Sequence, residues 1–291
     1  MVAPQAGLAA LALTFNAFTW GVSWWPFRWL QERGLHALWA TVLVYAVAVL
    51  LISLWRPQAW GQLWRTRSLW WLVLAAGATN AAFNTAVTIG DVVRVVLLFY
   101  LMPLWAVLLA RVLLGERLTA LTAVRVALAV GGAAIVLWPS DGSAGRMSVS
   151  TAEALALLGG FTFALNNVLL RREAHQPEGA RALAMFAGGT LVSLVAALWL
   201  AGMGTVPWPP VPAPGWVMGM LGLAGVFLLG NLALQYGTAR LPANATAVIM
   251  VSEVLFASGS AVALGAGSMS WSLALGGTLI IGASLLAAWR R

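Results

Sequence analysis

The stretch "ANATAVIMVSEVLFASGSAVAL", residues 243–264, contains one ionisable side chain, Glu253, close to its midpoint. The segment carries no other charge and, as a helix, is long enough to cross the ~30 Å hydrocarbon core of a bilayer. A carboxyl group at that depth costs about 2–4 kcal/mol on insertion scales and usually faces a cavity or a partner. The stretch therefore predicts a transmembrane helix, and Glu253 is the first candidate for a functional residue.

The rest of the chain has the same character. Of its 291 residues 62% are hydrophobic and only 8% are charged, which is typical of an integral membrane protein and not of a soluble domain. We therefore expect an all-α integral membrane protein with ten transmembrane helices joined by short connections. The expected spans are Leu8–Phe27, Leu35–Trp55, Leu69–Gly90, Val92–Leu114, Thr119–Trp138, Ser150–Leu170, Ala180–Ala201, Gly215–Tyr236, Ala243–Leu264 and Ser270–Trp289.

Several function classes are disfavoured by composition. The chain has no cysteine, which excludes disulfides, thiolate zinc sites and cysteine nucleophiles. Its two histidines, His36 and His175, fall in separate predicted loops, so we expect no metal site and no cofactor. The net charge of +8 comes from arginines placed mostly at span ends, and we expect no nucleic-acid partner.

The arginines also indicate orientation. With the N-terminus inside, twelve fall on the cytoplasmic side and four on the other, which by the positive-inside rule places both termini in the cytoplasm. The twelve are Arg56, Arg65, Arg67, Arg111, Arg117, Arg125, Arg171, Arg172, Arg181, Arg240, Arg290 and Arg291, and the four are Arg28, Arg33, Arg94 and Arg146. Arg94 lies three residues after Asp91, and we expect these two side chains to pair.

The two halves of the chain resemble each other. The segment "AFTWG" at 17–21 corresponds to "GFTFA" at 160–164, and further matches follow in the same order. These are Arg28 with Arg171, Asn80 with Asn231, Asn84 with Gln235, Gly115 with Gly265, and Gly132 with Gly282. A Gly/Ser-rich external linker at 139–150 separates residues 1–138 from residues 151–291. Because each unit has five spans, the two enter the membrane in opposite senses, which predicts two inverted five-helix repeats.

Over essentially its whole length, the chain also resembles a known family. The segment "YLMPLWAVLLARVLLGERLT" at 100–119 has a central proline, Pro103, and ends in the pair Gly115–Glu116. The first span carries the pair Trp20–Gly21 and then Arg28. These features resemble the EamA type of the drug/metabolite transporter superfamily and, within it, the YddG-like amino-acid exporters of the bacterial inner membrane.

The second half departs from that pattern. Glu253 replaces the central proline, and Ala266 replaces the acid after Gly265. The resemblance implies an EamA-like repeat in each half and export of small metabolites across a bacterial inner membrane.

Polar side chains inside the spans indicate a candidate site. Asn80 and Asn84 lie one helical turn apart, as do Asn231 and Gln235 at the equivalent positions of the other half. These amides either line a shared central cavity or join helices by hydrogen bonds. The full expected substrate-binding cavity comprises Asn16, Trp20, Asn80, Asn84, Tyr100, Trp105, Phe163, Asn166, Asn167, Asn231, Gln235 and Glu253.

Two residues have open alternatives. Pro103 kinks the fourth span and is either a hinge or a fixed packing feature. Glu253 binds a substrate ammonium group, takes up a proton during transport, or is a protonated structural residue.

A secondary transporter working by alternating access explains the inverted repeat, the amides and Glu253 together. The site is uncharged apart from Glu253 and has aromatic walls, which favours neutral and aromatic amino acids with broad specificity. The alternatives are export of another small metabolite or drug, or a facilitative, channel-like protein; an enzyme is not expected, since no nucleophile with its base lies at span depth. The expected partners are small-molecule substrates and the lipid bilayer, and a monomer is compatible with the sequence.

Overall fold

The computed structural model describes residues 4–115, 120–138, 149–238, 240–241 and 243–288. Every regular element within these ranges is a helix. The helices are α1 (Pro4–Val22), α2 (Trp24–Glu32), α3 (Ala37–Trp55), α4 (Gln58–Arg65), α5 (Leu69–Ile89), α6 (Val92–Phe99), α7 (Met102–Leu114), α8 (Ala120–Leu137), α9 (Thr151–Arg172), α10 (Glu178–Gly202), α11 (Pro214–Thr238), α12 (Ala243–Ala263) and α13 (Trp271–Ala288).

Seven helical segments of the described chain are long and apolar enough to cross a membrane. They are Ala6–Glu32, Ala37–Trp55, Leu69–Ile89, Val92–Leu113, Thr151–Arg172, Glu178–Gly202 and Pro214–Thr238. Three further apolar helices are shorter: Ala123–Leu137, Val248–Ala263 and Trp271–Ala283. The all-helical, multi-pass membrane architecture is thus confirmed, whereas the count of ten spans stays a prediction.

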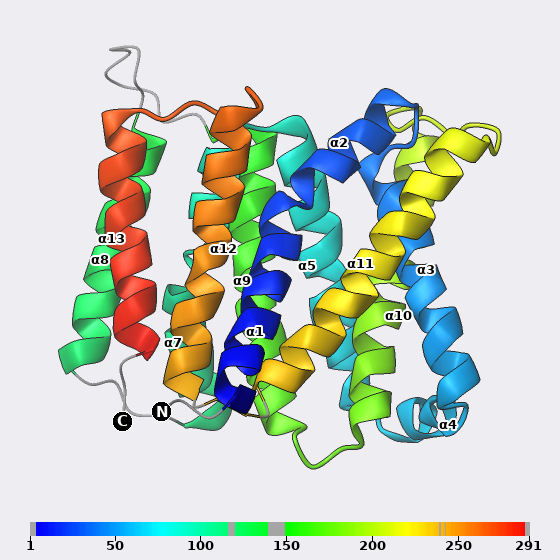
Figure 1. Ribbon diagram of the computed structural model, residues 1–291, viewed down its shortest axis with the longest axis horizontal. Helices are drawn as coiled ribbons and strands as arrows, with labels where there is room; N and C mark the ends of the chain where they lie inside the picture. Colours follow the sequence, from blue (N-terminus) through cyan, green and yellow to red (C-terminus); the bar gives the residue numbers. More distant parts are fainter. Residues whose placement is uncertain (1–3, 116–119, 139–148, 239, 242, 289–291) are drawn as a thin grey trace.

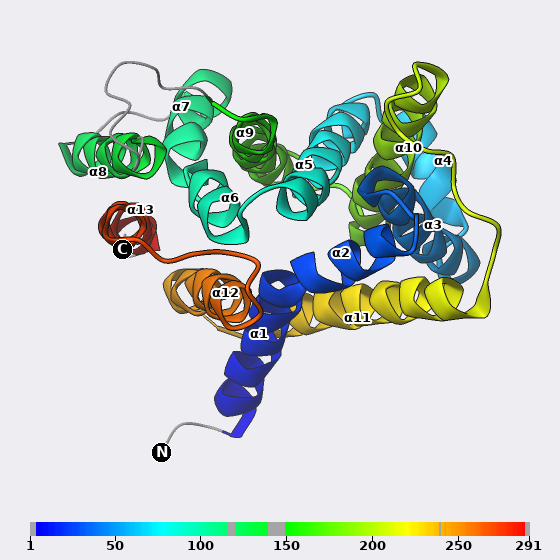
Figure 2. The ribbon, with the colours of Figure 1, turned by 90° about the horizontal axis from the view of Figure 1, so that it is seen from above.

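The helices form two layers. Seen from above, α8, α7, α9 and α5 lie in one layer, and α13, α12, α1 and α11 lie in the other (Figure 2). At one end of the layers α8 contacts α13, and at the other end α3 contacts α10. Helix α1 begins and α13 ends at the same face of the molecule, where the short helix α4 also lies (Figure 1).

Two of the long apolar segments are interrupted. The first is divided at Ser23 between α1 and α2, and another is divided at Tyr100 and Leu101 between α6 and α7. The second break comes just before Pro103, whose missing N–H would otherwise bond to the carbonyl oxygen of Phe99, one turn earlier. A kink near this proline was expected from the sequence, and the helix is interrupted there for two residues, Tyr100 and Leu101.

Helix α9 packs closely against this interruption. A Cβ atom built on Gly160 would lie 2.5 Å from the carbonyl oxygen of Phe99, closer than real Cβ contacts come. A residue without a side chain at this position therefore allows α9 to approach the end of α6.

Polar groups fix the helix ends at the face opposite α4. Asp91 begins α6 and accepts a hydrogen bond from the backbone N–H of Arg94 at 3.0 Å. The guanidinium group of Arg94 instead pairs with Glu153 on α9 at 2.7 Å. The expected side-chain pair of Asp91 and Arg94 is therefore wrong, because the carboxylate of Asp91 is used in capping the helix, where it satisfies free backbone donors.

Candidate functional site

Glu253 and Tyr100 meet across the two layers. Tyr100 lies at the interruption between α6 and α7, is 2% exposed, and its hydroxyl group hydrogen-bonds with the carboxyl group of Glu253 on α12. The same hydroxyl lies 3.4 Å from the carbonyl oxygen of Met250, one turn earlier on α12. Glu253 itself is only half-buried. The carboxyl group thus has the Tyr100 hydroxyl as a protein partner.

A second polar pair joins α3 and α5. The Tyr45 hydroxyl donates a hydrogen bond to the side-chain oxygen of Asn80, whose amide nitrogen donates to the carbonyl oxygen of Ala76 at 2.8 Å. Tyr45 is 3% exposed and was missed in the sequence analysis. Its signal was present, since a phenol in the middle of an apolar span needs a hydrogen-bond partner.

Asn16 and Asn84 are fully buried and bridge helices. The Asn16 amide donates to the carbonyl oxygen of Gly230 on α11 at 2.8 Å, and the Asn84 amide donates to the Thr41 hydroxyl on α3 at 3.0 Å. The side-chain oxygens of both residues have no hydrogen-bond partner among the described atoms. In this conformation each side chain donates one hydrogen bond to another helix, and its amide oxygen is free to accept one.

The aromatic candidates pack against other rings. Trp20 stacks on Phe227 of α11 with the ring centroids 4.5 Å apart. Trp105 meets Phe161 edge-on at 5.5 Å, and Phe163 lies 5.4 Å from Phe99.

The remaining candidates differ in exposure. Asn166 is 2% exposed, Asn167 is exposed, and Asn231 is half-buried. The side chains of Gln235 and Pro103 lie outside the described part of the structure, although the backbones of both are helical.

The predicted residues fall into two apolar clusters. Tyr100 belongs to a cluster that is centred on α6 and includes residues of α5, α8, α9, α12 and α13, and Trp105 and Phe163 pack against this cluster. Trp20 packs against a second cluster, which contains Tyr45 and Phe227. The sequence analysis expected these side chains to line one cavity or, in the case of the amides, to join helices by hydrogen bonds. The structure brings Glu253 together with Tyr100 on one side and Asn80 together with Tyr45 on the other.

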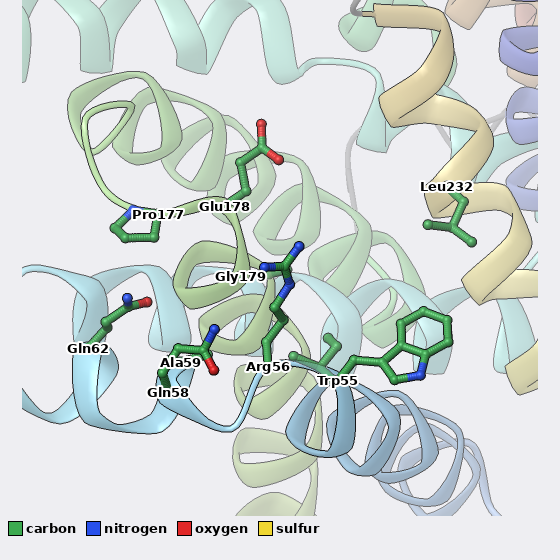
Figure 3. A pocket seen from close by; sticks show the side chains of 11 residues that line it. Trp55, Arg56, Gln58, Ala59, Gln62, Pro177, Glu178, Gly179 and Leu232 are labelled. Atoms are coloured by element: carbon green, nitrogen blue, oxygen red, sulfur yellow. The ribbon is translucent and has the colours of Figure 1, made fainter.

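A separate pocket of about 510 Å³ opens at the α4 face (Figure 3). It is bounded by the end of α3, by α4, by the start of α10 and by Leu232 of α11, and contains none of the predicted site residues. Within the described ranges, no three His, Cys, Asp or Glu side chains come together as a group that could hold a metal ion.

The break before Pro103 lies in a segment that matches a known family. Residues 7–138 match the EamA-like transporter family. Residues 7–138 belong to this family. The resemblance seen in Trp20–Gly21, Arg28 and residues 100–119 is confirmed for this part of the chain, and the family that it matches is one of membrane transporters.

Comparison of the whole chain supports the same fold. One solved structure, described as "Crystal structure of protein", has a TM-score of 0.59 and 20% sequence identity. The match covers 96% of this chain and 95% of that one, so the fold is shared over both halves. No curated protein matches the sequence.

Proposed function

We propose that this protein is a secondary transporter that exports amino acids, above all neutral and aromatic ones, by alternating access. The observation that carries the proposal is the contact of Glu253 with Tyr100 at the interruption between α6 and α7. A carboxyl group in the middle of an apolar helix is suited to hold a substrate ammonium group. The interrupted helix beside it is the kind of element found at transporter binding sites.

Two inverted repeats should make equivalent helix contacts, and the contacts between helices support such a symmetry. Helix α1 contacts α11 and α12, and its counterpart α9 contacts α5 and the pair α6 and α7. Helix α3 contacts α11, and its counterpart α10 contacts α5. We propose that residues 1–138 and 151–291 are two inverted five-helix repeats, joined by residues 139–150, and that ten spans cross the membrane.

Arginine placement supports the orientation of the protein in the membrane. The connections at the α4 face carry Arg56, Arg65 and Arg67 before α5 and Arg171, Arg172 and Arg181 around the start of α10. The positive-inside rule assigns this face to the cytoplasm. We place the protein in the bacterial inner membrane, with both termini in the cytoplasm, working as a monomer.

The surroundings of the site favour amino acids. Glu253 supplies a negative charge for an ammonium group, and Trp20, Trp105 and Phe163 supply apolar and aromatic surface for side chains. We propose that the other predicted residues, including Asn80 and Asn231, supply hydrogen bonds as the two units move.

Transport in proteoliposomes tests this function. Purified protein is reconstituted, and counterflow is measured with a panel of radiolabelled amino acids, nucleotide sugars and sugar phosphates. We expect saturable counterflow of several neutral and aromatic amino acids. Uptake of nucleotide sugars without any amino acid would refute the proposed substrate, and flux without counterflow would indicate a channel.

A further inference from the structure

The pocket at the α4 face presents both signs of charge. Arg56 lies at the end of α3 and Glu178 at the start of α10, and both line the pocket (Figure 3). Gln58 and Gln62 of α4 add two side-chain amides. Trp55 of α3 and Leu232 of α11 supply apolar surface beside these polar groups.

The polar side chains of this pocket are not engaged with the protein. Arg56 and Glu178 form no ion pair with each other, although they line one pocket of the described structure. The side chains of Gln58 and Gln62 likewise take part in no hydrogen bond with another described residue. Two opposite charges and two amides are therefore available to a ligand.

A pocket at the opposite face is different. It has a volume of about 570 Å³ and is lined by Asp91, Arg94 and Glu153. Arg94 and Glu153 neutralise each other at 2.7 Å, and Asp91 accepts hydrogen bonds from the backbone N–H groups of Arg94 and Ser268, each at 3.0 Å. Of these two pockets in the described part of the chain, the α4-face pocket is the one whose charged side chains form no ion pair with each other.

We infer that this pocket is a loading site where a zwitterionic amino acid binds before it reaches the centre of the protein. Arg56 binds the carboxylate, because a guanidinium group matches a carboxylate with two parallel hydrogen bonds. Glu178 binds the ammonium group, and Trp55 and Leu232 contact the amino-acid side chain. The volume of about 510 Å³ falls within the ~300–1,000 Å³ that is usual for small-molecule sites.

This inference rests on the proposed amino-acid export and adds a site outside the central one. Both charged side chains are exposed, so water weakens their interactions and each contributes a modest factor to binding. The site therefore raises the local concentration of zwitterions at the entrance and sets the concentration at which export is half-saturated.

The test uses everted membrane vesicles, in which the α4 face is outward. Uptake of radiolabelled leucine is measured against three competitors: unlabelled leucine, leucinamide, which lacks the carboxylate, and N-acetylleucine, which lacks the ammonium group. The variants are Arg56→Gln and Glu178→Gln. The matched control is Arg65→Gln, an exposed arginine of α4 that does not line the pocket.

We expect each pocket variant to raise the half-saturating concentration of leucine about two- to fivefold, the range of an exposed charge pair. Arg56→Gln should also remove the preference for leucine over leucinamide. Glu178→Gln should remove the preference for leucine over N-acetylleucine. In right-side-out vesicles both variants should behave as the wild type, and Arg65→Gln should do so in both preparations.

Two outcomes would overturn the inference while amino-acid export stands. In one, the wild type takes up leucine and both variants keep its half-saturating concentration and its preferences. In the other, the effect of Arg56→Gln follows the phosphatidylethanolamine content of the vesicles and not the competitor, which would make the pocket a lipid-headgroup site. Failure of the wild type to transport any amino acid would instead refute the proposed function itself.

Discussion

Gly21 of α1 lies directly against the backbone of Glu253 on α12. A Cβ atom on Gly21 would come within 2.8 Å of the Glu253 carbonyl oxygen and 2.7 Å of the Phe256 Cβ atom. The two helices can therefore approach this closely only because residue 21 has no side chain. Helix α1 thereby fixes the position of the helix turn that carries the candidate carboxyl group.

This contact predicts that Gly21→Ala destabilises the protein. The added methyl group has to push α1 away from α12, and overpacking of this kind costs about 1–3 kcal/mol. Thermal unfolding in detergent should show a lower midpoint. The matched control is Gly7→Ala in the same helix, where no atom lies within 4 Å and alanine should be neutral or stabilising. Equal midpoints for both variants would mean that α1 does not pack this closely on α12.

Glu253→Gln tests the carboxyl group itself. Glutamine keeps the length of the side chain and a hydrogen bond to Tyr100, so we expect a folded protein. Loss of a hydrogen bond to a charged group costs about 1.5–3 kcal/mol, which predicts a tenfold or greater fall in amino-acid affinity if Glu253 binds the ammonium group. If it carries a proton instead, export should lose its pH dependence while substrate exchange continues.

The control for this experiment is Glu32→Gln, an exposed carboxylate at the end of α2. It should leave affinity and pH profile as in the wild type. A Glu253→Gln variant with wild-type rate, affinity and pH profile would assign Glu253 a purely structural role.

Arg28 illustrates a family feature with a structural explanation. Its guanidinium group donates to the carbonyl oxygens of Val87, at 3.0 Å, and Gly90, where α5 ends. These carbonyl oxygens lack helical partners, and a positive charge is favourable at that end of a helix. We expect Arg28→Gln to lower the free energy of unfolding by about 1–3 kcal/mol without changing the half-saturating concentration of substrate.

Exposed Arg33 provides the comparison, since its guanidinium group lies over the Trp29 ring at 3.6 Å and holds no other helix. Arg33→Gln should lower the free energy of unfolding by less than Arg28→Gln does. If Arg28→Gln instead raises the half-saturating concentration at normal stability, Arg28 contacts substrate.

His36 gives the stability of α3 a dependence on pH. Its Nδ1 atom accepts a hydrogen bond from the backbone N–H of Leu38 at 3.2 Å, which only the form with an unprotonated Nδ1 can do. Burial lowers the pKa of His36 from its ordinary value of 6.5. The pKa of His36 is thus lower in the folded state than in the unfolded state. The contribution of this cap to the free energy of unfolding is therefore complete above about pH 6.5 and is lost as the pH falls through the folded-state pKa.

The unfolding midpoint should therefore fall on acidification more in the wild type than in His36→Asn, which keeps a capping side chain that does not titrate in this range. The comparison is made between pH 8 and pH 5, with His175→Asn in the exposed α9–α10 connection as control. Parallel pH profiles in all three proteins would exclude a role for this cap.

The fold could largely be read from the sequence because the bilayer sets the length of each apolar run. The third span was expected at Leu69–Gly90, and α5 covers Leu69–Ile89. The break at Ser23 was not predicted, since apolar residues continue through it to Phe27. Helix α4 was also missed, because its eight residues fall in a connection and fold there by packing Ala59 and Leu63 inward.

The candidate site was predicted by residue type and not by pairing. A phenol, an amide or a carboxyl group within an apolar run is visible in the sequence, as Asn80, Tyr100 and Glu253 were. Which groups meet depends on how neighbouring helices are shifted and rotated against each other. For that reason the contact of Glu253 with Tyr100, and that of Tyr45 with Asn80, could be found only in the folded chain.

Pro103 follows the interruption between α6 and α7, and this position predicts a role in movement. Pro103→Ala supplies the N–H group that the Phe99 carbonyl oxygen lacks, so the helix can continue through Tyr100 and Leu101. A continuous helix is stiffer, and we expect the maximal transport rate to fall about tenfold, while the unfolding midpoint stays equal or rises. Counterflow and thermal unfolding of the same preparations measure both.

Pro214→Ala is the control, because a proline in the first turn of α11 interrupts no helical hydrogen bond. Unchanged transport in Pro103→Ala would identify the interruption as a fixed packing feature, and a loss of transport together with stability would show that the variant damages the fold and not a hinge.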